Sequence, residues 1–498
     1  MASSLPVPEL AEPATACAER LLAADSVLVA SHIDADGLTS AAIAATALER
    51  AGLCFESVFS KQLDEAEIAS IAATDYDTVL FTDFGSGQLD IIADHEAAGD
   101  FTSVIADHHQ PADATTEFHL NPLLSGLDGA TELSGAGATY VLARALGTIR
   151  STTDGTTRSA TDGGVTAAAA ATDEPARDNR DLAALAVVGA VGDRQAGVDG
   201  LTGANEAIVE EGVAAGVVEA GTDITLYGKQ TRPLPKLLEY ATEAQIPGIT
   251  NDTAGAIEFL SELDLRLETD DGWRCWVDLT DEERQTLLSA LIQRAVASGV
   301  PADRIDDLVG TSYQLAAEEP GTVLRDASEF STLLNATARY ERADVGLAVC
   351  LGDRGEAFEQ AQMLLRNHRK NLSQGVEWVT SEGVTTEDNI QWFDAGDEIR
   401  ATIVGIIAGM AIGESGIRRD QPIIGFAEKS ADEIKVSARG NHALTAEGLD
   451  LSAVMRDAAR AVDGDGGGHD VAAGATIPPA TQSTFVSVAD EIVGDQLS

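Results

Sequence analysis

Residues 26–40, SVLVASHIDADGLTS, constrain the fold of this chain more than any other stretch. A short run of apolar and β-branched residues ends at His32, and Asp34 and Asp36 follow at alternate positions. A helical pattern of small residues comes next, so the stretch predicts a strand, an acidic loop and a helix. Ligands of open α/β sheets bind at the carboxyl ends of strands. The loop alone also fits a structural role, in which Asp36 and Thr39 only cap the helix.

Three further segments place Asp or His where an element is expected to end. The carboxyl ends of neighbouring parallel strands meet at one edge of a sheet, so these side chains should converge on the first loop. Carboxylates crowded together cannot all stay ionised without cations. Carboxylate oxygens and imidazoles suit Mn²⁺, Mg²⁺ or Zn²⁺, and two bridged ions would polarise a phosphoryl group and generate hydroxide. The segments are VLFTDFGSG with Asp83, SVIADHHQP with Asp107, His108 and His109, and VVGAVGDRQ with Asp193.

Each of these residues alone could be a cap, a turn residue or a histidine with satisfied hydrogen bonds. The pair His108-His109 is harder to explain in that way, because two imidazoles directly after a strand serve no packing need. Four segments with the same pattern favour a shared metal site over four unrelated caps.

The large excess of acidic residues indicates the environment and the kind of partner for which this protein is adapted. Asp and Glu number 82 against 32 Lys and Arg, a formal charge of −50 that is spread along the sequence. This indicates adaptation to a salt-rich cytoplasm rather than a dedicated basic partner, which would favour one acidic block. The rule that nucleic-acid-binding proteins are basic does not apply here, since counterion release contributes little in molar salt.

A soluble, cytoplasmic protein without a membrane segment is expected. The four scattered cysteines indicate reduced thiols rather than disulfides or a metal site. The N-terminus shows no signal pattern, and the apolar stretch at 401–412 is too short to span a bilayer. The cysteines are Cys17, Cys54, Cys275 and Cys350.

At 498 residues the chain exceeds a single core, and two or three domains are expected. Alternating strand and helix patterns over residues 26–121 predict a parallel sheet covered on both faces, within a domain that spans residues 1–200. Residues 151–178 are rich in Thr, Ala, Gly and Asp, so they predict a flexible surface insertion. The predicted strands are 27–31, 55–59, 78–83, 101–106 and 118–121, and the predicted helices are 38–51, 64–73, 87–98, 135–147 and 182–191.

The remaining chain predicts two further parts. Residues 201–330 carry helical patterns broken by prolines and are interpreted as a mostly helical insertion. Residues 331–498 are expected to form a second, smaller α/β domain. Its predicted elements are strands at 345–351, 400–407, 423–427, 434–438 and 474–477, helices at 356–378 and 451–462, and a glycine loop at 464–468.

The four Asp/His segments resemble the motifs of the DHH phosphoesterase superfamily, named for its Asp-His-His run. GGGHDVAAGA (466–475) resembles the glycine-histidine motif of the associated DHHA1 domain, and LLNATARYERADVGLAVCLGD (333–353) resembles the segment that joins the two domains in RecJ-type exonucleases. YGKQTRPLPKLLEY (227–240) is similar to the archaeal RecJ-like branch, which includes GINS-associated nucleases. The resemblance implies an α/β fold with an N-terminal parallel-sheet DHH domain, a helical insertion and a smaller DHHA1 domain, with the active site in the cleft between.

The resemblance also implies two divalent cations, with Mn²⁺ expected, Mg²⁺ as the alternative, and Asp83 as the bridging ligand. Asp107 would orient His108, and His109 would face the scissile phosphate or the leaving group. Bacterial RecJ chains usually carry Asp where His32 stands, and they continue into an OB-fold that is not visible here. The implied ligands are His32, Asp34 and Asp83 for one ion and Asp36, Asp83, His108 and Asp193 for the other.

For the second domain, the resemblance implies a phosphate grip. Glycine N–H groups would contact a phosphate, which needs the close approach that glycine allows. Taken alone, the glycines also fit an ordinary flexible turn. Arg339 would contact the phosphate near the metals as a catalytic residue. The implied substrate-binding residues are Ser437, Arg439, Gly466, Gly467, Gly468 and His469.

These features predict a metal-dependent phosphodiesterase that acts as an exonuclease on single-stranded DNA or RNA in replication or repair. One alternative within the superfamily is an enzyme for oligoribonucleotides or cyclic dinucleotides. A different alternative is a replisome scaffold that binds GINS, since some relatives in the replicative helicase assembly keep the fold and lose the metals. In this chain every implied metal position is filled.

Overall fold

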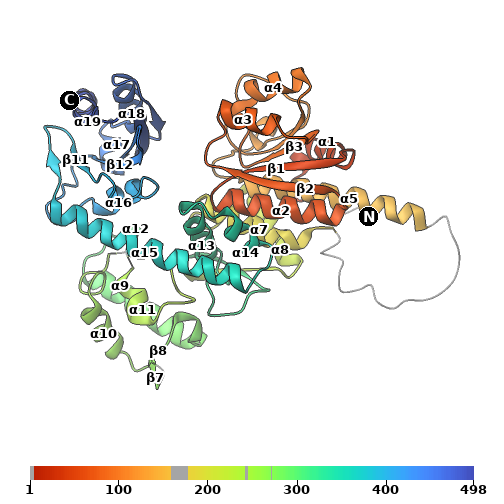
Figure 1. Cartoon of the computed structure of the whole chain (residues 1–498). Coiled ribbons are helices and arrows are strands. Elements are labelled where there is room, and N and C mark those ends of the chain that lie inside the picture. Colours follow the sequence, from red (N-terminus) through yellow and green to blue (C-terminus); the bar gives the residue numbers. More distant parts are fainter. Residues whose placement is uncertain (1–4, 159–177, 242–244, 271, 498) are drawn as a thin grey trace. The chain divides into compact units, whose positions relative to one another are not determined.

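A parallel sheet organises the first part of the chain (Figure 1). Its strand order is β2-β1-β3-β4-β5, and all neighbours pair in parallel, as the sequence predicts. The computed structural model describes the chain except residues 1–4, 159–177, 242–244, 271 and 498. The strands are β1 (Ser26–His32), β2 (Cys54–Ser60), β3 (Thr78–Thr82), β4 (Thr102–Ala106) and β5 (His119–Leu120).

Helices cover both faces of this sheet, which confirms the predicted architecture. Val29 and Leu80 point into a core with α1, α2, α5, α7 and α8, whereas Leu28 and Phe81 point into a second core with α3 and α4. The alternation follows from the period of two in a strand. The helices are α1 (Ala11–Leu22), α2 (Ala35–Ala51), α3 (Glu65–Ala72), α4 (Leu89–Ala98), α5 (Gly135–Arg158), α7 (Ala183–Gly192) and α8 (Gly203–Ala214).

The predicted insertion at residues 151–178 begins inside α5, and its residues 159–177 lie outside the described part of the chain. Short 3₁₀ helices occur at several connections. They are η1 (Pro8–Leu10), η2 (Ser86–Gln88), η3 (Pro122–Ser125), η4 (Arg180–Leu182) and η5 (Trp276–Asp278).

Residues 201–330 are not purely helical. An antiparallel strand pair, β6 with β9, accompanies a core built from helices. The elements are α9 (Leu234–Glu239), α10 (Thr253–Ser261), α11 (Asp281–Ala297), α12 (Ala302–Asp306), β6 (Val218–Ile224), β7 (Glu268–Thr269), β8 (Gly272–Trp273) and β9 (Val309–Leu315).

The predicted strand at 345–351 is wrong, because this segment is a helix. α13 (Ala327–Arg339) is followed by α14 (Ala343–Cys350), and both pack on α2. A Cβ on Gly346 would lie 2.7 Å from the Leu38 side chain, so glycine lets these helices approach closely. A short apolar run does not distinguish a buried strand from a buried helix by its periodicity.

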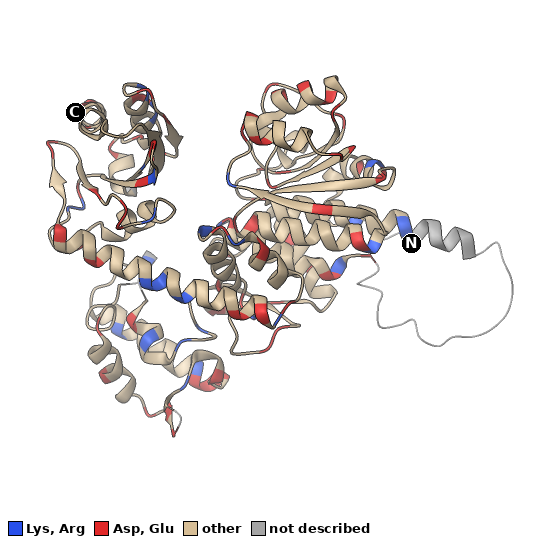
Figure 2. Ribbon diagram, viewed as in Figure 1, with Lys and Arg blue, Asp and Glu red and all other residues tan. Residues whose placement is uncertain are grey.

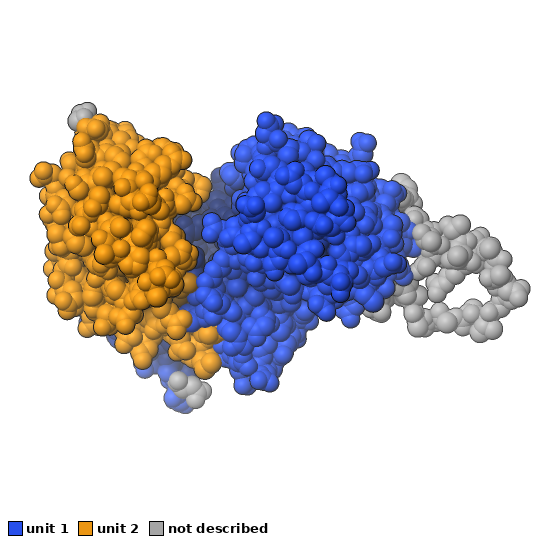
Figure 3. All heavy atoms as spheres, turned by 45° about the horizontal axis from the view of Figure 1, so that its top comes forward, with its two compact units in different colours: residues 1–361 blue, residues 362–498 orange. Residues whose placement is uncertain are grey.

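The chain divides into two compact units, residues 1–361 and 362–498, coloured separately in Figure 3. The division lies within α15 (Glu356–Glu382), where a long helix was predicted. The second domain was expected from residue 331, but α13 and α14 belong to the first unit.

The second unit is built on a mixed six-stranded sheet of order β10-β11-β12-β13-β15-β14. α16 packs on one face, and α18 and α19 pack on the other. The elements are β10 (Thr385–Thr386), β11 (Gln391–Asp394), β12 (Ile423–Ser430), β13 (Glu433–Arg439), β14 (Asp465–Gly468), β15 (Ala472–Ile477), α16 (Val404–Ala411), α17 (His442–Ala446), α18 (Leu451–Arg460) and α19 (Gln482–Gln496).

Two predictions for this unit are wrong. Residues 400–407 form a turn and the start of α16 rather than a strand, because their apolar side chains fill the core under the sheet. The glycines predicted as a loop at 464–468 form most of the edge strand β14, which pairs with β15. Glycine lowers the intrinsic preference for a strand, but the pairing with β15 outweighs it.

Acidic residues are spread over both units rather than gathered in one block, as Figure 2 shows. Within the described part of the chain, no helix combines the length and the apolar character needed to cross a membrane.

Glu329 on α13 is fully buried, and its carboxylate accepts hydrogen bonds from the Gln230 N–H (2.8 Å) and the Thr231 hydroxyl (2.9 Å). Burial raises the pKa of Glu329 from 4.5 to about 6. The protonated form of Glu329 is thus favoured in the folded state. The folded chain therefore loses stability as the pH rises from 4.5 through about 6 and this carboxyl group ionises.

We therefore expect the natural chain to lose stability relative to Glu329→Gln, which imitates the protonated acid, as the pH rises. The difference in their free energies of unfolding should change by about 2 kcal/mol between pH 4.5 and pH 7, in favour of the variant. Urea unfolding at both pH values measures this difference. The exposed Glu258→Gln is the matched control and should show none. Equal effects of the two substitutions would contradict the account.

Candidate functional site

The carboxyl ends of β1, β3 and β4 and the end of α7 bring Asp and His side chains together. Three overlapping groups each offer ligand atoms that all lie within 4.8 Å of one another. We call their union the His/Asp cluster. The groups are His32, Asp34 and Asp83; Asp36, His108 and Asp193; and Asp83, Asp107, His108 and His109.

Asp83 and His108 each belong to two of the three groups, and together they connect the cluster. Asp83 follows β3 directly with a φ of 60°, and its N–H donates to the Ala106 carbonyl. One carboxylate oxygen lies 3.3 Å from His108 Nε2, and the other lies 3.5 Å from His32 Nδ1. Burial raises the pKa of Asp83, but the two imidazoles outweigh it and hold the pKa below its usual value. A Cβ on Gly135 would lie 2.4 Å from this carboxylate, so the start of α5 needs glycine.

His108 has a ring orientation that fits a metal ligand. Its Nδ1 lies 2.6 Å from the Gly129 carbonyl, which can only accept, so Nδ1 carries the proton. Nε2 then faces oxygens of Asp83 (3.3 Å) and Asp36 (3.9 Å). This arrangement is unfavourable unless a proton or a metal ion lies between the atoms. Burial alone lowers the pKa of His108. The opposite effect of Asp83 and Asp36 is larger, so the pKa rises to about 11.

Asp36 does not cap its own helix, so the interpretation of Asp36 as the cap of that helix is wrong. Asp34 is the N-cap of α2 and accepts from the Gly37 N–H at 2.9 Å. The Asp36 carboxylate instead accepts from the first N–H groups of α5, Gly135 (2.7 Å) and Ala136 (3.0 Å). Burial and the charges of neighbouring carboxylates still raise the pKa of Asp36, and a cation bound beside it would favour its charged form.

The other two candidate ligands, His32 at the end of β1 and Asp193 after α7, complete the cluster. His32 Nδ1 lies 3.1 Å from Asp34 and 3.5 Å from Asp83. Burial lowers the pKa of His32, but these two carboxylates raise it to about 11. Asp193 ends α7, lies 3.8 Å from His108 and accepts from Gln195 Nε2 at 2.8 Å. The set of carboxylate and imidazole donors fits hard or borderline divalent cations.

Asp107 supports the neighbouring histidines from a fully buried position. One oxygen accepts from the His108 backbone N–H and from His109 Nδ1, both at 2.8 Å, and the other accepts from the Ser86 N–H at 2.9 Å. Asp107 therefore holds the ring of His109 and only the backbone of His108. The His109 side chain is 54% exposed, so its Nε2 is accessible.

Arg339 lies near this cluster in the same unit. The Asn335 side chain, one turn earlier on α13, accepts from the Ala35 N–H at the start of α2 (3.1 Å). Burial and the nearby Arg194 lower the pKa of Arg339, and Asp34 partly offsets them.

In the second unit, Ser437, Arg439 and Gly467 lie on one face of the sheet, whereas Gly466 and Gly468 alternate to the other face. Ser437 pairs with Gly474, which pairs with Gly467, so these three positions lie side by side. A Cβ on Gly467 would meet open space, and one on Gly405 of α16 would lie 2.5 Å from the Arg439 guanidinium. Gly466 and Gly468 belong to the same strand, and the His469 N–H donates to Ala472. How this face and the His/Asp cluster act together stays a prediction.

Gly129, Gly135, Gln195 and Arg194 shape the site but were not predicted from the sequence. Contacts between segments far apart in the chain give the first three their roles, and no local motif signals such contacts. For Arg194 a local signal existed, because it directly follows Asp193.

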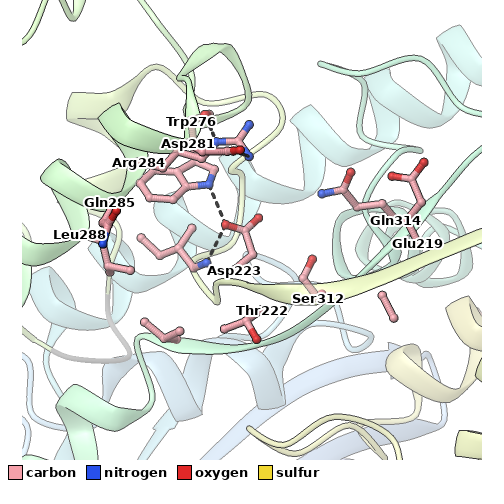
Figure 4. A pocket seen from close by; sticks show the side chains of 14 residues that line it. Glu219, Thr222, Asp223, Trp276, Asp281, Arg284, Gln285, Leu288, Ser312 and Gln314 are labelled. Carbon is pink, nitrogen blue, oxygen red and sulfur yellow. Dashed lines mark hydrogen bonds and ion pairs between the residues drawn. The ribbon is translucent and has the colours of Figure 1, made fainter.

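A pocket of about 500 Å³ lies elsewhere in the first unit, lined by β6, β9 and α11 (Figure 4). Trp276 Nε1 donates to Asp223 at 2.9 Å across it, and Asp223 also pairs with Lys229. None of the predicted site residues lines this pocket.

Comparison with known proteins gives matches to three family models. The model of the DHH family, N-terminal domain, matches residues 26–169, the DHH-CID domain matches residues 226–309, and the DHHA1 domain matches residues 389–495. An uncharacterized protein of Methanocaldococcus jannaschii is 29% identical and covers 95% of this chain and 94% of its own.

Two solved structures share the fold. RecJ from Thermus thermophilus, in complex with Mn²⁺, has a TM-score of 0.58 and 17% identity over 99% of this chain, which spans 56% of that RecJ chain. CDC45 from Entamoeba histolytica has a TM-score of 0.61 and 11% identity over 97% of both chains. The chain therefore contains a DHH family N-terminal domain, a DHH-CID domain and a DHHA1 domain, in this order, and its fold is similar to that of RecJ.

Proposed function

We propose that the protein is a metal-dependent phosphodiesterase that removes nucleotides from one end of single-stranded DNA or RNA, in replication or repair. The observation that carries this proposal is the His/Asp cluster, in which Nε2 of His108, the ring nitrogen that does not contact Gly129, faces two carboxylates. A divalent cation between these atoms would make that arrangement favourable. The Mn²⁺ in the Thermus RecJ structure supports Mn²⁺, with Mg²⁺ as the alternative.

The chain's own residues divide the work. His32, Asp34, Asp36, His108 and Asp193 would hold two divalent cations, with Asp83 between them. Bound there, such ions polarise a phosphodiester and lower the pKa of water. His109, held by Asp107, faces solvent and would contact the scissile phosphate or the leaving group. Ser437, Arg439, the glycines of β14 and His469 would grip the strand.

End-labelled strands test the proposal. DNA and RNA oligonucleotides, labelled at the 5′ end or the 3′ end, are incubated with Mn²⁺ or Mg²⁺ in molar salt. Stepwise shortening from one end is expected, with duplexes and circular strands resistant. Intact linear strands, or cleavage of circles, would contradict the proposal.

The likeness to CDC45 over 97% of both chains favours a second candidate, a replisome component that binds GINS. A pull-down with GINS, using the natural chain and Asp83→Asn, separates the two roles. Retention of GINS by both forms supports a scaffold that is independent of hydrolysis, and no retention excludes it. A preference for dinucleotides over long strands would instead identify an oligoribonuclease of the same superfamily.

A further inference from the structure

Arg194 occupies a backbone position that normally belongs to glycine. The N–H of Gln195 donates to the Ala190 carbonyl and the N–H of Arg194 to the Val191 carbonyl, the pattern of a Schellman helix end. Its residue after the cap has a left-handed backbone, and Arg194 has a φ of 61°. Arginine is strained there and glycine is not. Strain of this kind persists mainly where a side chain is needed.

The end of α7, which precedes Arg194, packs against α13, which carries Arg339. A Cβ on Gly192 would lie 2.7 Å from Ala35 and 3.2 Å from Ser331, so this end packs between α2 and α13. Ser331 and Arg339 are two turns apart on the same face of α13. The pKa of Arg339, lowered in part by Arg194, agrees with this proximity.

Neither guanidinium makes an ion pair or a side-chain hydrogen bond within the described residues. This is unusual in a chain with 82 acidic and 32 basic residues, where other arginines have carboxylate partners, as Arg274 has Glu283 and Arg354 has Glu318. The charge of Arg194 acts unfavourably on the charge of Arg339, and an anion bound by both guanidiniums would relieve this repulsion. Arginine forks match the geometry of phosphate oxygens.

The charge balance of the site indicates which phosphate of the substrate the two guanidiniums would bind. Two divalent cations would balance the four carboxylates of Asp34, Asp36, Asp83 and Asp193, and the fifth carboxylate of the cluster, Asp107, has His109 as its partner. A phosphodiester at the ions carries a single negative charge, which leaves one guanidinium without a partner. We propose that Arg194, together with Arg339, binds a second phosphate of the substrate, adjacent to the one that is cut. This inference rests on the proposed function. It predicts that the enzyme prefers strands and phosphorylated oligonucleotides, which carry a second phosphate, to dinucleoside monophosphates, which do not.

Arg194→Gly tests the inference without an artefact of misfolding, since glycine suits the backbone. The midpoint of thermal unfolding should rise by about 1–2 °C. The kcat/KM for a dinucleotide with an extra terminal phosphate should fall about 10–100-fold, mainly through KM. For the dinucleotide with one phosphodiester it should change less than about 3-fold, and Arg194→Lys should keep part of the preference. Substrates phosphorylated at the 5′ end and at the 3′ end are compared separately.

Ala480→Gly is the matched control, because Ala480 is exposed and has a φ of 65° in the second unit. It should raise the midpoint similarly and leave both substrates unaffected. Equal losses on all substrates with Arg194→Gly, or no loss, would overturn the inference. If the natural chain cleaves none of them, the proposed function fails. In that case fluorescence anisotropy with the labelled phosphorylated dinucleotide tests the inference through binding alone. Arg194→Gly should bind it more weakly than the natural chain, and equal affinities would overturn the inference.

Discussion

Replacement of Asp83 by Asn is expected to lower the rate of strand hydrolysis by about 10³-fold or more. Asp83 is the one residue whose two oxygens approach ligand nitrogens on both sides, His32 and His108. An amide has nearly the same shape, but it offers one neutral acceptor and cannot bridge two cations. Asn tolerates the φ of 60° at this position, so the fold should be retained.

Asp94→Asn, on the exposed surface of α4, is the matched control and should leave the rate unchanged. Initial rates with saturating Mn²⁺ measure the effect, and circular dichroism checks the fold. A rate for Asp83→Asn within about 10-fold of the natural chain would mean that the cluster is not the catalytic centre.

Replacement of Asp107 by Ala is expected to lower the free energy of unfolding by about 3 kcal/mol and also to reduce hydrolysis. The substitution leaves the N–H groups of Ser86 and His108 without their buried acceptor and releases the ring of His109. Burial raises the pKa of Asp107, but His109 outweighs it and lowers the pKa from 3.8 to about 2. The stabilisation is therefore full above pH 3.8 and disappears as the pH falls through about 2.

Denaturant unfolding at neutral pH and near pH 3 tests this expectation, with a smaller difference between variant and natural chain in acid. Asp113→Ala is the control, because Asp113 is exposed in the loop that follows His109. A neutral-pH difference no larger than that of the control would show that the Asp107 carboxylate does not support the site.

The sequence predicted most of the His/Asp cluster for a simple geometric reason. Parallel strands end at one edge, so Asp83 after β3 and Asp107, His108 and His109 after β4 had to lie near the loop that follows β1. What could not be predicted was the partner of each atom. Asp36 finds its donors at Gly135, 99 residues away, and His108 finds its acceptor at Gly129.

The wrong predictions have a common physical origin. The segments 345–351 and 400–407 are short and apolar, and their burial on all sides removes the alternation that separates strand from helix. The glycines at 466–468 have weak local preferences, so pairing with β15 decides their structure. In each of these cases tertiary contacts determine the outcome.

Electron paramagnetic resonance of bound Mn²⁺ tests the central claim most directly, because it distinguishes two adjacent ions from ions spread over an acidic surface. The natural chain with two equivalents of Mn²⁺ in high salt should give the spectrum of a spin-coupled pair, and Asp83→Asn should not. A spectrum of isolated ions only, the same for the natural chain and the variant, would contradict the account.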